Sequence, residues 1–260
     1  MSFANITFEA SDGVGLLTVN RPDKLNALNA KTVGELDEVV ARVAEDSSIR
    51  ALIVTGAGEK AFVAGADINE LAVATPLEAE SLARRAQRVF RRLETMRKIS
   101  VAAVNGFALG GGLELAMACT VRFASPNARL GQPEVKLGIV PGYGGTQRLP
   151  RLVGRGRALE MLLGGEPVDA QRAFEMGLVN QIFPREELVA RSRAWLEKAL
   201  ANAPVALALV MEAVDVGLDA GLEQGLRFEA VAFGLACATE DRNEGTQAFL
   251  EKRKAAFAGK

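Results

Sequence analysis

The chain has 260 residues, of which 49% are hydrophobic and 24% are charged, and its formal net charge is −1. This length and balance are typical of a globular protein with a full hydrophobic core, and they argue against a surface dedicated to nucleic acid. The chain contains no histidine. This excludes Ser-His-Asp and Cys-His catalysis and histidine-ligated metal sites, so proton transfer must use Glu, Asp, Lys, Cys, the single tyrosine or a bound cofactor.

The sequence also carries signals about location. The N-terminus has neither the basic start nor the apolar segment of a secretory signal. The longest apolar stretches fall far short of the roughly 18 residues that a membrane-spanning helix needs. The two cysteines lack metal-ligand spacing and suit a reducing compartment. We therefore expect a cytoplasmic protein without a membrane partner.

Strand and helix patterns alternate along the first 183 residues, which predicts an α/β fold. Ser11-Asp12-Gly13 makes the first two strands a predicted hairpin, and Thr75-Pro76-Leu77-Glu78 is a capping box that predicts the start of a long helix. The predicted strands cover residues 6–8, 14–19, 51–55, 101–104, 121–124 and 179–182. The predicted helices cover residues 30–45, 76–97, 113–118, 155–163 and 169–175.

From about Pro184 the pattern changes, and helical segments dominate to the end of the chain. These segments carry apolar residues at more positions than one core-facing stripe requires, which favours contacts with neighbouring subunits. We therefore expect two regions. Residues 1–200 form a core that carries the functional site, and residues 201–260 form an α-helical oligomerisation region.

Three motifs have simple structural interpretations. Gly56-Ala57-Gly58-Glu59-Lys60-Ala61 is similar to a dinucleotide-binding fingerprint, but no helical stripe follows it, so we interpret it as a glycine-rich turn. The glycine-dense segment at 138–146 has no P-loop lysine, which excludes a Walker A motif. The arginine-rich run at 84–92 is interpreted as a solvated helix face, and a basic RNA-binding face is the alternative.

The segment at 101–114 (VAAVNGFALGGGLE) is the centre of the predicted chemistry. An apolar run ends in Asn-Gly, and Gly110-Gly111-Gly112 then leads into a helical segment that carries Glu114. Glycines allow close approach to backbone N–H groups, and such groups at a helix N-terminus attract negative charge. A second glycine-flanked segment, at 62–67, supplies further N–H groups. Two donors from separate loops that point at one position form an oxyanion hole.

A second carboxylate, Glu134, follows Gly131-Gln132-Pro133 in a predicted loop. Each carboxylate alone has an ordinary interpretation, since Glu114 suits the helix dipole and Glu134 suits an exposed loop. Placed close together, they would push one pKa up, so that one acts as acid and the other as base near neutral pH. With the oxyanion hole, they predict an acid–base enzyme that acts on a carbonyl compound.

Several motifs spread over nearly the whole chain make a more specific pattern. They are Asn20-Arg21-Pro22 with Leu25-Asn26-Ala27-Leu28, AFVAGADINE at 61–70, AAVNGFALGGGLELAMAC at 102–119, LGQPEVKLGIVPGYGGTQRLPRLVG at 130–154 and EDRNEGTQAFLEKRK at 240–254. In this combination the chain resembles the crotonase (enoyl-CoA hydratase/isomerase) superfamily, and most closely its short-chain enoyl-CoA hydratases.

The resemblance implies a fold, an assembly and a reaction. The fold is a spiral of ββα units with a helical C-terminal region that forms homotrimers, often paired as hexamers. The reaction is reversible addition of water across the 2,3 double bond of a 2-enoyl-CoA to give a 3-hydroxyacyl-CoA, as in β-oxidation of fatty acids. It needs no metal or redox cofactor. The alternatives are an enoyl-CoA isomerase, a 3-hydroxyacyl-CoA dehydratase and an RNA-binding member of the superfamily.

The resemblance also assigns roles to residues. The two catalytic glutamates fall on Glu114, expected to activate water, and Glu134, expected to protonate the α-carbon. The oxyanion hole falls on the N–H groups of Ala66 and Gly111. Tyr143 stands beside the acyl pocket, where small residues or Phe are common, so chain-length preference stays open. The residues implied to contact coenzyme A or the acyl group are Lys24, Leu25, Ala64, Asp67, Ile68, Gly142, Tyr143 and Lys252.

Overall fold

The computed structural model describes residues 3–260. The chain divides into two compact units, the first ending at Arg193 and the second running from Ala194 to Lys260. The first unit is α/β and the second is helical, as expected from the sequence. The assignment of the substrate site to residues 1–200 and of trimer contacts to residues 201–260 stays a prediction.

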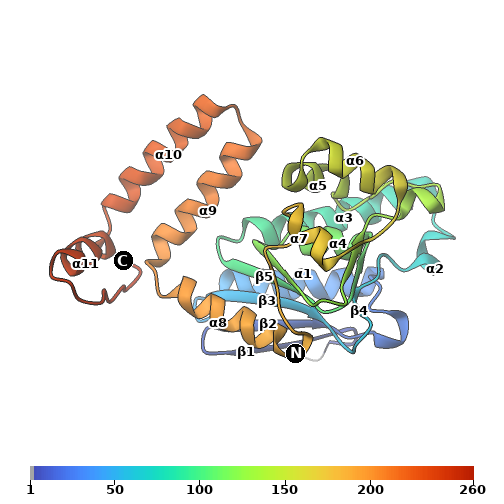
Figure 1. Ribbon diagram of the computed structural model, residues 1–260, viewed down its shortest axis with the longest axis horizontal. Coiled ribbons are helices and arrows are strands. Elements are labelled where there is room, and N and C mark those ends of the chain that lie inside the picture. Colours follow the sequence, from blue (N-terminus) through green and yellow to red (C-terminus); the bar gives the residue numbers. More distant parts are fainter. Residues whose placement is uncertain (1–2) are drawn as a thin grey trace. The chain divides into compact units, whose positions relative to one another are not determined.

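A six-stranded mixed sheet runs through the first unit (Figure 1). The predicted hairpin is confirmed, because the first two strands pair antiparallel, and all other neighbours are parallel. The two central apolar strands are buried along their full length, which explains their continuous hydrophobic pattern. In sheet order the strands are β1 (Ile6–Ser11), β2 (Val14–Val19), β3 (Ala51–Gly56), β5 (Ile99–Val104), β7 (Val121–Ala124) and β10 (Gln181–Ile182).

A second, four-stranded mixed sheet is built from much shorter strands. Three successive pairs along the chain, β3–β4, β5–β6 and β7–β8, each give one strand to the first sheet and one to the second. This repeated division produces the spiral of ββα units that the resemblance implied. In sheet order the strands are β4 (Ala61–Val63), β6 (Phe107–Leu109), β8 (Arg129–Gly131) and β9 (Val168–Asp169).

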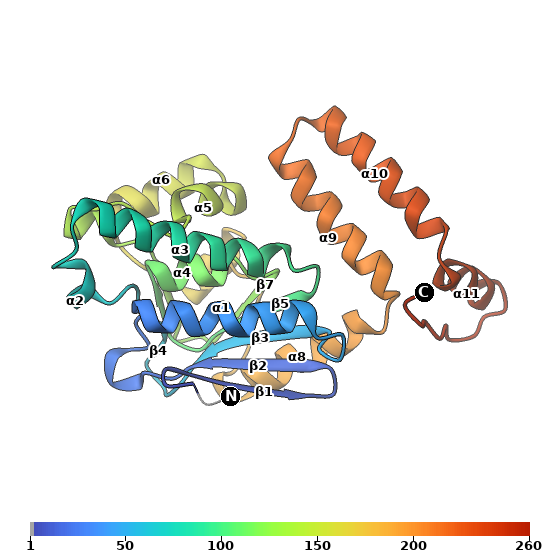
Figure 2. The same ribbon diagram turned by 180° about the vertical axis from the view of Figure 1, so that it is seen from behind.

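Helices cover the sheets of the first unit. Helix α1 begins after Asn29, whose side chain accepts a hydrogen bond from the backbone N–H of Thr32, and α3 begins with the predicted capping box. These two long helices lie side by side (Figure 2). The helices are α1 (Ala30–Glu45), α2 (Ile68–Leu71), α3 (Pro76–Thr95), α4 (Gly111–Met117), α5 (Gly145–Val153), α6 (Arg155–Gly164) and α7 (Ala170–Glu175). Each of three 3-10 turns lies between a strand and the helix that follows it. They are η1 (Pro22–Lys24), η2 (Glu134–Leu137) and η3 (Arg185–Glu187).

The chain passes from the first unit to the second within α8 (Leu188–Leu200). The second unit then contains α9 (Pro204–Asp219), α10 (Leu222–Cys237) and α11 (Glu240–Leu250). Within residues 3–260, no single helix is long and apolar enough to span a membrane, and only the sharply bent pair Arg185–Leu200 and Pro204–Asp219 passes by length and composition.

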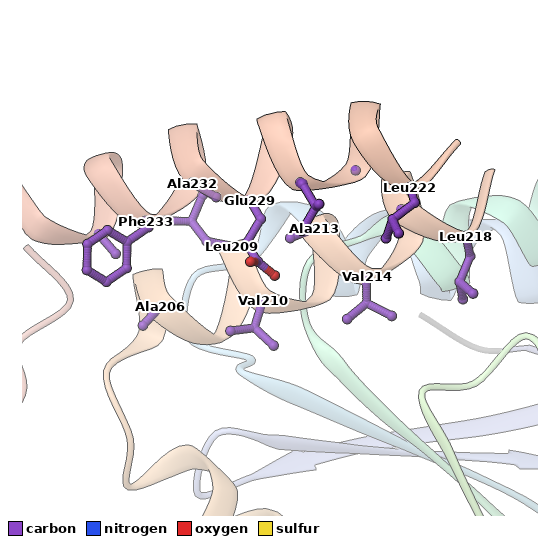
Figure 3. Close-up of a pocket in the computed structure, with 14 residues that line it drawn as sticks. Ala206, Leu209, Val210, Ala213, Val214, Leu218, Leu222, Glu229, Ala232 and Phe233 are labelled. Carbon is purple, nitrogen blue, oxygen red and sulfur yellow. The ribbon is translucent and has the colours of Figure 1, made fainter. Parts of the chain in front are cut away.

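Helices α9 and α10 form an antiparallel pair with an apolar groove of about 470 Å³ between them (Figure 3). Its lining includes Val210 and Phe233, which are 62% and 72% exposed. Glu229 is the one acidic side chain drawn in this groove. The second unit therefore presents a large apolar surface that its own helices leave uncovered.

Candidate active site

A cavity of about 530 Å³ opens in the first unit beside the N-terminus of α4. Its volume is in the range typical of small-molecule sites. The cavity gathers predicted site residues from four separate stretches of chain. They are Ala64, Ala66, Ile68, Gly111, Glu114, Glu134, Gly142 and Tyr143.

The N–H groups of Ala66 and Gly111 lie close together in this cavity, since a Cβ added to Gly111 would lie 3.5 Å from the Ala66 nitrogen. Ala66 pairs with Leu28 through a bridge in which the Leu28 N–H donates to the Gly65 carbonyl and the Asp67 N–H donates to the Leu28 carbonyl. The N–H of Ala66 itself therefore points away from Leu28. Gly111 is the first residue of α4, where an N–H has no acceptor within the helix. Among residues 3–260 neither N–H donates to a protein acceptor. Both are therefore available to a ligand oxygen.

The three glycines before Glu114 serve different steric purposes. Gly110 has φ +51°, a left-handed value that glycine adopts most readily. A Cβ on Gly111 would lie 3.0 Å from the Tyr143 ring, and one on Gly112 would lie 1.9 Å from the Val63 carbonyl oxygen. Helix α4 begins at Gly111, two residues before the predicted start, and its first two residues are glycines because close packing against Tyr143 and Val63 leaves no room for a side chain there.

Glu114 is almost completely buried, at 1% exposure, in the first turn of α4. Its Oε1 accepts hydrogen bonds from the backbone N–H groups of Tyr143 and Gly145, each at 2.7 Å. Burial, supported by the nearby Glu134 carboxylate, raises the pKa of Glu114 to about 7 against the lowering effect of these two bonds. Glu114 therefore changes protonation state close to neutral pH.

Glu134 begins the short turn η2 and is 8% exposed. Gln132, which is fully buried, faces it, and in the amide orientation that satisfies both groups its nitrogen donates to Oε1 at 2.9 Å and to Oε2 at 3.0 Å. Burial raises the pKa of Glu134 to about 7. The expectation that Glu134 is not merely an exposed loop residue agrees with this burial.

Two carboxyl groups with pKa values near 7 therefore face one cavity with two free backbone donors. Near neutral pH such a pair holds one proton between its members, which supplies a base and an acid together. The donors stabilise negative charge that develops on a carbonyl oxygen. Within residues 3–260 no group of three or more Cys, Asp or Glu side chains is placed to hold a metal ion.

Tyr143 forms part of the cavity wall. Its ring packs at right angles to that of Phe90, with ring centroids 5.9 Å apart, and its Cδ2 and Cε2 atoms lie close to Gly111. Burial raises the pKa of Tyr143 to about 12, so its phenol stays protonated at neutral pH. Apolar residues of α2 and of the segment after η2, such as Leu71 and Val140, continue the wall.

Other residues implied to contact coenzyme A lie outside the cavity lining. Leu25 lines a separate depression of about 410 Å³, although its carbonyl accepts the N–H of Ala64. The Asp67 carboxylate forms an ion pair with Arg21 at 3.0 Å and caps α2, so a structural role occupies it. Lys24 ends the exposed turn η1. Lys252, which follows α11 in the second unit, keeps only its predicted role.

The sequence assigned no role to two polar residues that support the site. Gln132 orients Glu134, and Asn26, also fully buried, donates to the carbonyls of Ala57 and Ala61 at 2.9 and 2.8 Å. Both stand inside the motifs that carried the family resemblance. The signal that could have found them is a polar amide side chain within an otherwise apolar or glycine-rich motif. Such a side chain, once buried, must have hydrogen-bond partners.

Comparisons with known proteins identify the family of this chain. The family model described as enoyl-CoA hydratase/isomerase matches residues 9–260. A short-chain-enoyl-CoA hydratase from Clostridium acetobutylicum is 46% identical over 98% of this chain and 97% of its own length. A crotonyl-CoA hydratase from Syntrophomonas wolfei is 46% identical over the full length of both chains.

Solved structures give the same result for the fold. The crystal structure of an enoyl-CoA hydratase from Bacillus anthracis has a TM-score of 0.94 and 39% identity, and it covers 99% of this chain and 100% of its own. One from Geobacillus kaustophilus has a TM-score of 0.95 and 41% identity, with 99% of both chains covered. The predicted fold and resemblance are confirmed, and the chain belongs to the enoyl-CoA hydratase/isomerase family.

Proposed function

We propose that this protein is an enoyl-CoA hydratase that adds water reversibly to a 2-enoyl-CoA and gives a 3-hydroxyacyl-CoA. The observation that carries the proposal is the meeting of two buried carboxyl groups, Glu114 and Glu134, with the free N–H groups of Ala66 and Gly111 in one cavity. Relatives named as short-chain-enoyl-CoA and crotonyl-CoA hydratases support a short acyl chain.

In the proposed reaction, the thioester carbonyl oxygen accepts hydrogen bonds from Ala66 and Gly111. These bonds withdraw electrons from the conjugated double bond and stabilise the enolate that forms. Glu114 takes a proton from water, whose oxygen bonds to the β-carbon. The carboxylic acid of Glu134 gives its proton to the α-carbon, and the carbonyl is restored.

The two glutamates differ in a way that supports this division. Glu114 accepts two backbone N–H bonds, which favour its ionised form and suit a base. Glu134 faces the single side-chain amide of Gln132 instead, which can donate to the ionised carboxylate or, turned over, accept from the protonated carboxyl. Because this contact suits both forms, Glu134 is the better of the two to hold the proton. After the reaction Glu114 carries the proton and Glu134 is ionised, and exchange with solvent resets the pair.

We further propose how the rest of the substrate binds. The pantetheine arm passes Ala64 and Ile68 at the cavity mouth, and Gly142 and Tyr143 face the acyl group. Lys24, Leu25 and the backbone near Asp67 lie along the coenzyme A side, and Lys252 approaches a phosphate. Coenzyme A belongs to the substrate, and no redox cofactor takes part because water addition involves no net oxidation or reduction.

The apolar surface of the second unit supports assembly into a homotrimer, or a hexamer formed by two trimers. Exposed side chains such as Val210, Val214 and Phe233 would each be covered by a neighbouring subunit. Sedimentation velocity at micromolar concentration measures this directly. A monomer would contradict the proposed assembly.

The direct test of activity is the loss of the conjugated-thioester absorbance when the protein meets crotonyl-CoA. An isomerase would instead move the double bond of a 3-enoyl-CoA and hydrate crotonyl-CoA poorly. The RNA-binding alternative has little support in the arginine-rich helix α3. Arg84, Arg91 and Arg92 are paired there with Glu80, Glu94 and Asp37. Salt-dependent binding in an RNA gel-shift assay would support the RNA-binding alternative.

A further inference from the structure

The hydrogen bonds that hold Glu114 come from a segment with little stiffness of its own. Tyr143 and Gly145 donate both bonds, and they are flanked and separated by Gly142 and Gly144. Glycine has the largest conformational freedom of any residue. Contacts with the rest of the fold hold its two ends, because Gly145 is the first residue of α5 and Gln87 on α3 donates to the Gly142 carbonyl at 2.7 Å. The Tyr143 peptide, which lies between two glycines, needs a further contact to fix its N–H group.

Arg148, one turn into α5, contacts this segment directly. Its Nη1 donates to the Tyr143 carbonyl at 3.1 Å, and its guanidinium lies against Gly144, where an added Cβ would come within 2.3 Å of Nη1. Its other nitrogens, Nε and Nη2, donate to the two carboxylate oxygens of Glu94 on α3, each at 3.1 Å. The Arg148 and Glu94 side chains are only 14% and 24% exposed. Paired, planar contacts of this kind fix orientation as well as distance.

We propose, on the basis of the hydratase function above, that Arg148 held by Glu94 is a positioning residue for Glu114. The pair clamps the Tyr143 carbonyl from α3 and α5, so that the N–H groups of Tyr143 and Gly145 meet one oxygen of Glu114. Arg148 does not touch the reacting atoms. It acts through the peptide groups that Glu114 contacts.

Arg148 also contributes charge. Three titratable or charged side chains face Glu114. Glu134 on η2 and Tyr143 in the cavity wall do not compensate the negative charge of ionised Glu114, whereas Arg148 does. The guanidinium lowers the pKa of Glu114 against the effect of burial. Loss of this cation should therefore raise the pH at which Glu114 ionises.

The proposal is tested with Arg148→Gln and Arg148→Lys in the full-length protein. Arg148→Gln removes both the guanidinium hydrogen bonds and the positive charge. We therefore expect kcat for crotonyl-CoA hydration to fall about 10–100-fold with KM nearly unchanged. Its acid limb in the kcat–pH profile should move upward by about 1 pH unit. Arg148→Lys keeps the charge, so its limb should stay near the wild-type position although kcat still falls.

Arg92→Gln is the matched control, because Arg92 joins the same helix α3 to Asp37 on α1 and is not among the residues that line the cavity. If Arg148 only stabilises the packing of the helices, all these variants should have a lower melting temperature, and the acid limb of the kcat–pH profile should not move. Folded Arg148→Gln with wild-type kcat and an unmoved limb would overturn the proposal. So would an equal loss of kcat in Arg92→Gln.

A second readout separates this inference from the hydratase function. Infrared difference spectra, with Glu114→Gln as reference, follow the ionisation of the Glu114 carboxyl without substrate. We expect the midpoint to rise in Arg148→Gln and to return toward wild type in Arg148→Lys. If wild-type protein does not hydrate crotonyl-CoA, the proposed function fails, while this titration still decides whether Arg148 controls Glu114. An unshifted midpoint would reject the inference alone.

Discussion

The carboxylate of Glu134 lies directly over the Cα of Gly110, so that a Cβ added there would come within 2.8 Å of Glu134 Oε1. Gly110 also has φ +51°, and it is the N-cap of α4, the helix that carries Glu114. One glycine thus brings the two carboxyl groups to the same cavity. It does so by leaving room for one of them and turning the chain that holds the other.

Gly110→Ala should therefore reduce crotonyl-CoA hydration by on the order of 10²-fold, because it displaces the proposed proton donor from its position. Gly154→Ala is the matched control, since Gly154 has φ +80° and nothing within 4 Å of its added Cβ. Both substitutions place a Cβ on a backbone conformation that other residues rarely adopt, which costs about 1–3 kcal/mol. Steady-state kinetics on both folded variants should show the large loss only in Gly110→Ala, and equal losses would contradict this explanation.

The oxyanion hole is tested at Gly111, where two substitutions separate the N–H from the space around it. Gly111→Pro deletes the donor at the first helical position, where proline is tolerated. Gly111→Ala keeps the donor and adds the same contact with the Tyr143 ring. We expect kcat to be on the order of 10²–10³ lower in the proline variant than in the alanine variant. Similar kcat values in the two would place the carbonyl elsewhere.

The raised pKa values predict a bell-shaped dependence of kcat on pH centred near 7. Glu114 must be ionised to act as base, so activity falls as the pH drops below its pKa of about 7. Glu134 must be protonated to act as acid, so activity falls as the pH rises above its pKa of about 7. Initial rates with saturating crotonyl-CoA from pH 5 to pH 9 would check this. A flat profile across this range contradicts the assignment.

The sequence predicted the elements whose signals are local. The hairpin, α1 with its Asn29 cap and α3 with its capping box all form where neighbouring residues alone favour them. Strands β4, β6, β8 and β9 were missed because two or three residues carry too little periodicity, and pairing with distant strands creates them. Helix α5 was missed because glycines precede it and Pro150 lies inside it.

The site divides in the same way. Glu114 and Glu134 stand in recognisable motifs, but Glu134 Oε1 meets Gly110 only after the two sheets have formed. Arg148 lies in the motif at 130–154, but the sequence assigned it no role because its partner Glu94 lies 54 residues earlier. Ion pairs between distant helices depend on tertiary packing and leave no periodic pattern in a sequence.

Tyr143 should limit the length of the acyl chain, because its ring fills space between Gly111 and Phe90. Tyr143→Ala removes this part of the wall and should raise kcat/KM for 2-octenoyl-CoA relative to crotonyl-CoA by about 10-fold or more. Tyr143→Phe keeps the ring and should keep the wild-type preference. An unchanged ratio in Tyr143→Ala would show that the acyl chain leaves the cavity by another side.

The central claim is that two glutamates act together on one water, and Glu→Gln substitutions test it most directly. Glu114→Gln and Glu134→Gln keep size and hydrogen bonding but remove proton exchange. Crotonyl-CoA hydration should fall by about 10²–10⁴-fold in each variant, and the double variant should fall little below the worse single one. Hydration at the wild-type rate in either folded single variant would contradict the two-glutamate mechanism.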